Sequence, residues 1–284
     1  MVEWRRLLVP GIFLALLACE HIFPLRQRER PWHRRLLLNL IVSAGVLLVG
    51  SLVVGSASVA GLNWGMGRGI GLLHVLALPP WAAVVLGVLL MDLTFYYWHL
   101  ANHKIALLWR FHNVHHIDPD LDVSTSFRFH FMEIAYSTPF RLAQVLVLGI
   151  TPSTYVMYQM AFTCATMFHH ANVRLPFQFE RWLIKVIVTP RMHGIHHSAV
   201  LSETDSNYSV IFSWWDRFHR TLVLNIRQAA IDIGVPGYRR PEDNRLGSLL
   251  TMPFGRQRDY WHLADGAEPA GHQIPGVAAS EMLP

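Results

Sequence analysis

The feature that most constrains the fold of this chain is residues 36–60, a run of 25 residues without a charged side chain. About 20 apolar residues in a helix are enough to cross the hydrocarbon core of a bilayer, so this run predicts a membrane-spanning helix. The composition agrees with a lipid environment. Only 15% of the 284 residues are charged, whereas a soluble domain has about 25%. We therefore expect an integral membrane protein.

Other apolar stretches lie on both sides of this run. The Gly-rich segment 65–71 is predicted to be the loop that follows it. Thr151 and Pro152 interrupt the pattern between two shorter stretches, which predicts a helical hairpin that dips into the bilayer. The further stretches predicted to be helical are 7–24, 75–97, 132–149 and 153–168. Together they predict an all-α fold, an integral membrane helical bundle with a cytoplasmic, histidine-rich helical cap.

Composition divides the chain into three parts. The N-terminal spans and loops occupy residues 1–74, the motifs described below occupy 75–225, and a C-terminal extension occupies 226–284. An amphipathic stretch, 177–188, lies within the second part. The last residues, 262–284, are rich in Gly, Ala and Pro. Such a segment buries little apolar surface, which predicts that the extension is partly disordered.

Basic residues orient the chain in the membrane. Five arginines precede the first long span, at positions 26, 28, 30, 34 and 35. Such a run next to an apolar stretch is typical of a cytoplasmic flank. The span 36–60 then leads out and the span 75–97 leads back, so the segments that follow return to the cytoplasmic face. No aromatic-interleaved basic patch accompanies the arginines, which argues against a nucleic-acid partner.

Histidine is the unusual residue of the chain, with 17 copies, whereas Cys19 and Cys164 are the only cysteines and predict no disulfide framework. Eight histidines form three clusters, and within each cluster the spacing places the imidazoles on one helix face. The clusters are His99 and His103; His112, His115 and His116; and His193, His196 and His197.

Imidazole is a good ligand for iron, zinc, copper and nickel. Eight imidazoles are more than one ion needs, so the clusters predict two metal ions. A structural zinc site uses four ligands and commonly includes cysteine. Histidines scattered at a membrane interface are the plain alternative, but clustered ionisable residues near a membrane usually serve a function.

The three clusters and their flanking segments resemble the fatty acid hydroxylase and sterol desaturase superfamily. The resemblance covers about residues 85–220. The segments that carry it, besides the clusters, are Asp92–His99, Leu108–His112, Arg128–Glu133, Phe168–Val173, Thr189–His193, Glu203–Tyr208 and Trp215–Arg217. Two positions depart from the family pattern as we expect it: Phe131 follows His130 where we expect proline, and Phe218-His219-Arg220 follows the Trp-Asp-Arg segment where we expect Leu-Phe-Gly.

The resemblance implies a non-haem enzyme with two iron ions that uses O2 as a co-substrate. It also implies a ninth metal ligand on the second helix of the hairpin, for which His170 is preferred over its neighbour His169. Electrons must then come from a separate donor, because neither a haem-attachment motif nor a dinucleotide fingerprint is visible in the sequence.

Five further residues are predicted to support the metal ligands. Asp92 precedes His99 by two helical turns and could accept a hydrogen bond from a ligand imidazole, or instead pair with Tyr96 or an arginine. His130 and Glu133 could support the ligands, or His130 could be a ligand itself; an interfacial pair is the alternative. Asn172 and Asn207 could hold the third cluster, or act as ordinary turn residues.

These features predict a membrane-bound oxidoreductase that hydroxylates or desaturates a lipid. The substrate could be a fatty acyl chain, a sterol, a carotenoid or an ether lipid. A metal transporter is one alternative, although transporters place their ligands at mid-membrane; a catalytically inactive metal-binding scaffold is another. The aromatic residues Tyr96, Tyr97, Trp98 and Trp109 are interpreted as an interfacial belt.

Overall fold

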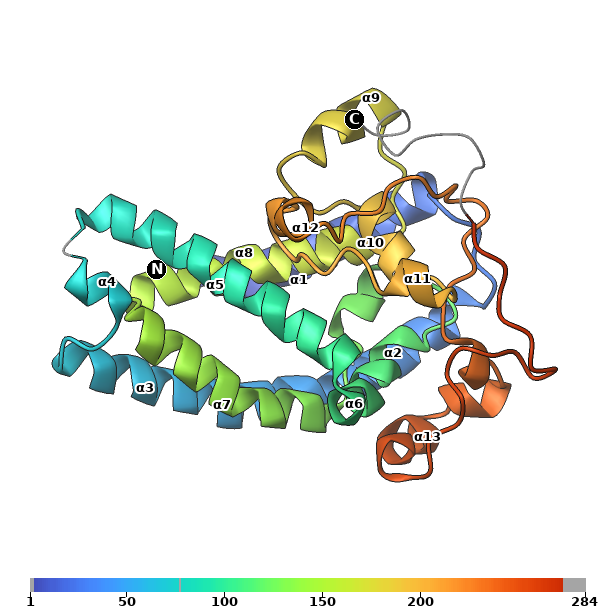
Figure 1. Ribbon diagram of the computed structural model, residues 1–284, viewed down its shortest axis with the longest axis horizontal. Coiled ribbons are helices and arrows are strands. Elements are labelled where there is room, and N and C mark those ends of the chain that lie inside the picture. Colours follow the sequence, from blue (N-terminus) through green and yellow to red (C-terminus); the bar gives the residue numbers. More distant parts are fainter. Residues whose placement is uncertain (1–2, 77, 273–284) are drawn as a thin grey trace.

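The computed structural model describes residues 3–76 and 78–272. Within these residues the chain is helical, and its only β-bridges are isolated pairs. Long helices lie alongside one another and short helices gather at one end of the bundle (Figure 1). Two segments are long and apolar enough to cross a membrane, Trp32–Val75 and Pro80–Lys104. The predicted all-α membrane bundle is therefore confirmed, and the side of the membrane that carries the histidines remains a prediction.

The first long span is continuous and longer than predicted. Helix α2 (Trp32–Val49) passes through a π-helical segment, η1 (Gly50–Gly55), directly into α3 (Ser56–Gly67). The prediction that the loop begins at Gly65 is therefore wrong. Gly61 and Gly65 serve helix packing, because a Cβ at Gly61 would come within 2.4 Å of the Leu142 side chain on the neighbouring helix.

The second long span carries the first histidine cluster. After the single turn α4 (Leu72–Val75), helix α5 runs over Pro80–Lys104, with Pro80 in its first turn, where its lack of an amide hydrogen costs nothing. The helix starts five residues later than the predicted 75–97 and ends seven residues later. His99 and His103 thus project from the same rigid helix that enters the bundle.

The predicted hairpin is confirmed. Helix α7 (Phe131–Leu148) is followed by α8 (Pro152–His170). Thr151 caps α8, since its hydroxyl accepts a hydrogen bond from the Thr154 amide at 3.2 Å. Helix α8 extends two residues beyond the predicted 168, so His169 and His170 form its last turn. Helix α1 (Glu3–Ile22) packs against α8.

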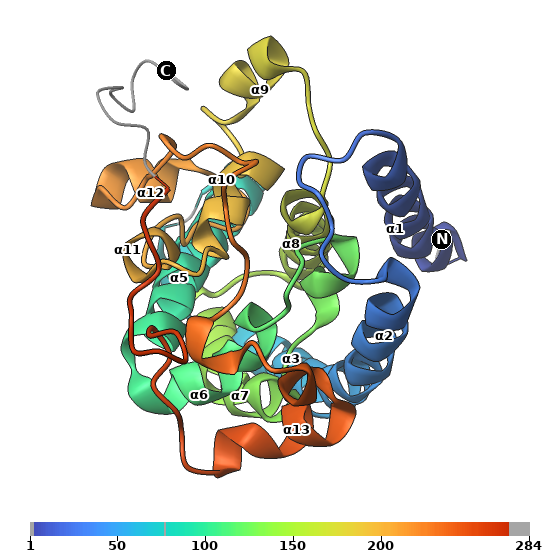
Figure 2. The same cartoon turned by 90° about the vertical axis from the view of Figure 1, so that its right-hand side faces the viewer.

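Short helices and loops form the cap at one end of the bundle (Figure 2). Within the amphipathic stretch 177–188, a helix forms over the first seven residues and ends at Leu183. The cap elements are α6 (Ala106–His116), η2 (Val123–Phe127), α9 (Phe177–Leu183), α10 (Pro190–His196), α11 (Leu201–Thr204), α12 (Trp214–His219), η3 (Pro236–Tyr238), η4 (Pro241–Asn244), α13 (Leu246–Thr251) and η5 (Met252–Phe254).

The arginine run lies at the same end as the cap. Near the start of α2, the Arg35 guanidinium donates to the Asp118 carboxylate just after α6, with Nε and Oδ1 2.6 Å apart. Both the entry to the first span and the exit from the second therefore lie at the end that holds the histidines. The predicted topology of the two spans agrees with this arrangement.

The C-terminal extension is packed against the cap as far as the structure describes it. Trp261 stacks on Trp109, with ring centroids 5.6 Å apart, and Leu249 is fully buried. Disorder was predicted from residue 262, but His272 contacts the buried Glu203 carboxylate through both its amide and Nδ1, at 2.8 and 2.9 Å. For 262–272 the prediction is therefore wrong, and residues 273–284 lie outside the described part.

Gly149 is expected to tolerate no side chain. It ends α7 in the left-handed region, with φ of +66°, and a Cβ there would lie 2.8 Å from the Gly71 Cα. Gly149→Ala should cost about 1–3 kcal/mol of unfolding free energy, from backbone strain and from this contact. Gly67→Ala is the matched control, because nothing lies within 4 Å of its Cβ position. Thermal unfolding in detergent measures both, and equal midpoints would contradict the expectation.

Candidate metal centre and its cavity

The nine histidines predicted as metal ligands converge in the cap. They come from α5, α6, α8, α10 and the residue directly after α10, and in each of two groups the candidate ligand atoms lie within 4.8 Å of one another. We name these the five-histidine group and the four-histidine group. The first contains His99, His103, His112, His116 and His196; the second contains His115, His170, His193 and His197.

Hydrogen bonds fix which nitrogen of several imidazoles is free to bind a metal. In four of them Nδ1 faces a backbone carbonyl, which can only accept, so Nδ1 carries the proton and Nε2 keeps its lone pair. The four carbonyl contacts are His99 to Tyr208 at 2.8 Å, His115 to Arg128 at 3.1 Å, His170 to Thr166 at 2.7 Å and His196 to Ser206 at 2.7 Å.

The lone pairs of the four-histidine group face one another. His115 and His170 both donate through Nδ1, so neither has a proton on Nε2, yet the two Nε2 atoms are 3.1 Å apart. Two such lone pairs repel unless a cation lies between them. Nitrogens about 2.1 Å from one ion, at right angles, are about 3.0 Å apart. The Nε2 atoms of His193 and His170 are 3.0 Å apart, which agrees with this geometry.

The five-histidine group contains buried nitrogens that lack a hydrogen-bond partner. Among the described residues, this holds for Nε2 of His103, His112, His116 and His196. Leaving several buried polar atoms unpaired costs about 1–3 kcal/mol each, so their concentration at one place needs an explanation. A bound cation satisfies all four together. The residues therefore fit the pair of metal ions predicted from the sequence.

Burial keeps several of the candidate ligands in the neutral form that metal binding requires. Desolvation, reinforced by neighbouring imidazoles, lowers the pKa of His193, His196 and His197 well below the usual value. The same causes lower the pKa of His115 and His116. No proton therefore has to be removed from these rings near neutral pH before they can bind a cation.

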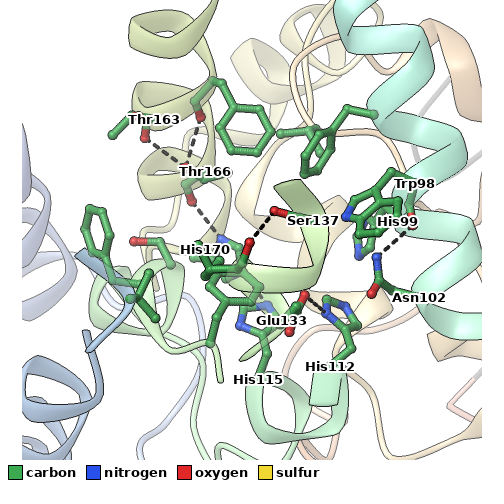
Figure 3. Close-up of a pocket in the computed structure, with 18 of the residues that line it drawn as sticks. Trp98, His99, Asn102, His112, His115, Glu133, Ser137, Thr163, Thr166 and His170 are labelled. Carbon is green, nitrogen blue, oxygen red and sulfur yellow. Dashed lines mark hydrogen bonds and ion pairs between the residues drawn. The ribbon is translucent and has the colours of Figure 1, made fainter. Parts of the chain in front are cut away.

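Glu133 orients one of the candidate ligands. Glu133 lies in the first turn of α7, and its Oε1 is 2.9 Å from Nδ1 of His112 (Figure 3). This contact leaves Nε2 of His112 free. Glu133→Ala is expected to weaken metal binding by about 10- to 100-fold, the usual effect of removing a residue that orients a ligand. Glu133→Gln keeps an acceptor for His112 and should lose less. Competition with a metal-binding dye measures both, and equal affinities would contradict this role.

Two other predicted support residues have contacts that differ from those proposed. Asp92 accepts hydrogen bonds from the amides of Ile211 and Phe212 and from the Trp215 indole, at 2.8 to 3.2 Å, and not from an imidazole. Asp92 therefore holds the segment that contains the Tyr208 and Val210 carbonyls, which orient His99 and His169. His130 caps α7 through Nδ1, and its Nε2 faces the Leu250 carbonyl at 3.2 Å, so it belongs to neither histidine group.

The two asparagines hold backbone segments. The Asn207 amide donates to the carbonyl of Met192, next to His193, at 3.0 Å, as proposed for a residue that supports the third cluster. The Asn172 side chain instead accepts a hydrogen bond from the Arg26 amide and donates one to the Arg26 carbonyl, both at 2.8 Å. The Arg26 guanidinium then lies over Gly194, where a Cβ would be 2.1 Å from its Nη1. Asn172 thus reaches the third cluster through Arg26.

Sequence reasoning missed the role of Asp216. Its carboxylate accepts hydrogen bonds from the amides of Tyr208 and Ser209, at 2.8 and 2.9 Å, and from the Thr221 hydroxyl. It therefore fixes the backbone next to the carbonyl that orients His99. The Trp215–Arg217 segment marked the position, but no local pattern shows which amides a carboxylate will meet.

A mostly apolar cavity of about 180 Å³ opens beside the histidine groups. Figure 3 shows His99 and His112 at one side of it, and Thr163, Thr166 and His170, all from α8, at the other. Trp98 lines this cavity, whereas Tyr96 and Trp109 are buried in the protein, so the interfacial-belt interpretation is wrong for these three. Of the four aromatic residues, only Tyr97 is exposed, at 49%. His169 lines the cavity outside both groups, with Nδ1 3.1 Å from the Val210 carbonyl.

Comparison with known proteins places the matching region around this centre. The fatty acid hydroxylase family model matches residues 84–221. Ornithine lipid hydroxylase of Rhizobium tropici is 29% identical over 174 residues, which is 61% of this chain and 51% of that protein. Human alkylglycerol monooxygenase is 27% identical over 152 residues, covering 50% of this chain and 30% of that protein.

Human cholesterol 25-hydroxylase is also similar, with 27% identity over 138 residues, 48% of this chain and 49% of that protein. This chain thus spans about half or less of the length of these relatives. No solved structure matches it significantly. The matched residues 84–221 contain all nine histidines of the two groups. This region of the chain therefore matches the fatty acid hydroxylase family, as the resemblance predicted.

Proposed function

We propose that this chain is a membrane-bound, non-haem di-iron oxidoreductase that uses O2 to hydroxylate a lipid. The observation that carries the proposal is the pair of buried histidine groups, each with unprotonated nitrogens directed at one another, beside an apolar cavity. Similar proteins are named for hydroxylation or monooxygenation of an ornithine lipid, an alkylglycerol and cholesterol, and all three are lipids.

A pair of iron ions, when bound, would supply the redox chemistry that O2 requires. The five-histidine and four-histidine groups would hold one ion each. The protein's own contribution is to hold several of these rings by a hydrogen bond at Nδ1, so that Nε2 stays free to face the ion. The rings held in this way are His99, His112, His115, His170 and His196. The apolar cavity walls, among them Phe95 and Phe162, exclude water from the site and receive the hydrocarbon part of the substrate.

The arrangement favours an enzyme over the alternatives. A transporter would place ligands at the middle of the membrane on broken helices. Here the histidine groups lie at one end of the bundle, and α5 continues through both His99 and His103. A cavity that opens onto the histidine groups gives a lipid access to them, which a scaffold would not need. Desaturation uses the same centre and remains the second outcome.

The proposal also includes the setting of the reaction. Residues 75–225 form the catalytic part, with 1–74 as its membrane anchor and 226–284 as a C-terminal extension whose described part contributes to the cap. The arginine run near Arg35 favours the cytoplasmic face for the histidine groups. Electrons come from a separate donor, which the chain has to meet at that face.

Oxygen labelling tests the proposed reaction. Cells that express the chain are grown under oxygen-18, and their lipids are compared by mass spectrometry with those of cells that carry an empty vector. Hydroxylation predicts a lipid that gains one labelled oxygen atom, whereas desaturation predicts a lipid that loses two hydrogens and gains no label. Identical lipids in the two cultures, with the metal-loaded protein present in the membrane, would contradict the proposal.

A further inference from the structure

A single basic side chain, Arg141, lines the cavity beside the histidine groups. It belongs to the middle of α7, is partly buried and has no oppositely charged partner among the ion pairs of the described residues. Its guanidinium lies 5.4 Å from the centroid of the Phe95 ring. A cation within an apolar bundle is costly, and such residues usually face a substrate or ion path.

The direction of the Arg141 side chain argues against a purely interfacial role. Long basic residues near the end of a span extend toward the nearest water. Arg141 instead donates from Nε to the Ser137 hydroxyl at 3.2 Å, one turn earlier on α7. The side chain therefore runs back toward Glu133 and the histidine groups, and away from the hairpin turn at Gly149.

The charge of Arg141 therefore lies in the same cavity as the candidate metal centre. Ser137 follows Glu133 by four residues, which is about 6 Å of helix rise. Glu133 is the only other residue of the cavity wall with an ordinarily charged side chain, and its carboxylate already contacts His112. Thr163 adds a hydroxyl from α8, and the remaining walls near Arg141, Phe95 and Phe162, are apolar.

We propose that Arg141 binds an anionic group of the lipid substrate, a carboxylate or a phosphate, and so selects an acidic lipid. The proposal rests on the function proposed above. A guanidinium can bind either group through two parallel hydrogen bonds, and the surrounding aromatic rings keep water from competing. Because the cation and the histidine groups line one small cavity, the carbon that is oxidised lies nearer the anionic group than the far end of the chain.

Paired lipids that differ only in charge test the selectivity. Binding of oleate is compared with methyl oleate, and oleoyl lysophosphatidate with monooleoylglycerol, to the metal-loaded protein in nanodiscs. The anionic member of at least one pair should bind about tenfold or more tightly, the usual scale of a charge-assisted hydrogen bond. The pair that shows the preference identifies carboxylate or phosphate as the group. A ratio near one in both pairs overturns the proposal without any variant.

Variants then assign the preference to this residue. Arg141→Gln should bring the affinity ratio close to one, and Arg141→Lys should keep part of it, because lysine retains the charge without the planar fork. Arg68→Gln is the matched control, since it removes an exposed arginine that stacks on Trp64 at the end of α3. An unchanged ratio in Arg141→Gln would overturn the assignment.

The position of the labelled oxygen separates this proposal from the one it rests on. Fragmentation of the oxygen-18 product should place the new hydroxyl within the first few carbons from the anionic group, and a hydroxyl near the methyl end would overturn the inference about Arg141. If the protein binds no metal and gives no labelled product yet prefers anionic lipids, the proposed oxidation fails while the binding role of Arg141 stands.

Discussion

Cells that express a variant with alanine at His103 or at His197 are expected to accumulate at least about 100-fold less oxidised lipid than cells with the unaltered chain. One variant removes a ligand from the five-histidine group and the other from the four-histidine group. Even residues that only orient a ligand change metal affinity or activity by about 10- to 100-fold, so a ligand itself should have at least the larger effect.

The matched control for these variants is the double substitution His33→Ala with His74→Ala. Both residues are exposed and belong to neither histidine group, so lipid oxidation should persist. Mass spectrometry of oxygen-18 products measures all three strains at equal protein levels in the membrane. Full activity with alanine at His197 would contradict the role of the four-histidine group.

Replacing Arg35 by methionine is expected to lower the unfolding free energy by about 3–5 kcal/mol, the cost of breaking a buried charge network from one side. Arg35 is 5% exposed and bonds to both Asp118 and Asp122 at 2.6 Å. Burial alone would raise the pKa of Asp118, but Arg35 and Arg128 outweigh it and lower this pKa. Without Arg35, Asp118 keeps only Arg128, 3.9 Å away, and Asp122 keeps no ion-pair partner among the described residues.

This network also positions the second histidine cluster, because Asp118 follows His116 by two residues. Arg34→Met is the control, as the neighbouring arginine is exposed and has no ion-pair partner within the described part of the chain. Denaturant unfolding in detergent compares the two variants. A loss below about 1 kcal/mol in Arg35→Met would show that the network contributes little to stability.

The sequence predicted most of the helices and brought the candidate ligands together for a simple reason. Helical spacing places residues i, i+3 and i+4 on one face, so each cluster had to present its imidazoles together. The arginine rule gave the two spans opposite directions, which puts the clusters at one end. The hairpin was readable because Thr151 and Pro152 are strong signals of a helix start.

The predictions about Gly65 and the aromatic belt were wrong because tertiary packing decides how these residues are used. Glycine marks a loop only when its conformation requires it, and Gly61 and Gly65 are instead used for close packing against α7. Tyr96, Trp98 and Trp109 resemble a membrane belt in sequence, yet tertiary contacts bury Tyr96 and Trp109 and turn Trp98 toward the cavity. Local patterns carry no information about which distant segment will cover a residue.

The polar partners were equally hidden. Asp92 was predicted to accept a hydrogen bond from an imidazole. Its carboxylate instead accepts from the amides of Ile211 and Phe212, more than 100 residues away in the sequence. Arg141 lies within the predicted helix 132–149 and gave no signal beyond its charge. Its significance depends on the cavity, which forms only when α5, α7 and α8 pack together.

The most direct test of the central claim is the metal content of the purified chain. Elemental analysis of the detergent-purified protein should find about two iron atoms per chain. The variants His115→Ala and His196→Ala, one from each histidine group, should each retain about one or fewer, with unfolding midpoints that show both to be folded. A folded protein without bound metal, or a metal content unchanged in both variants, would contradict the di-iron centre and with it the proposed oxidation chemistry.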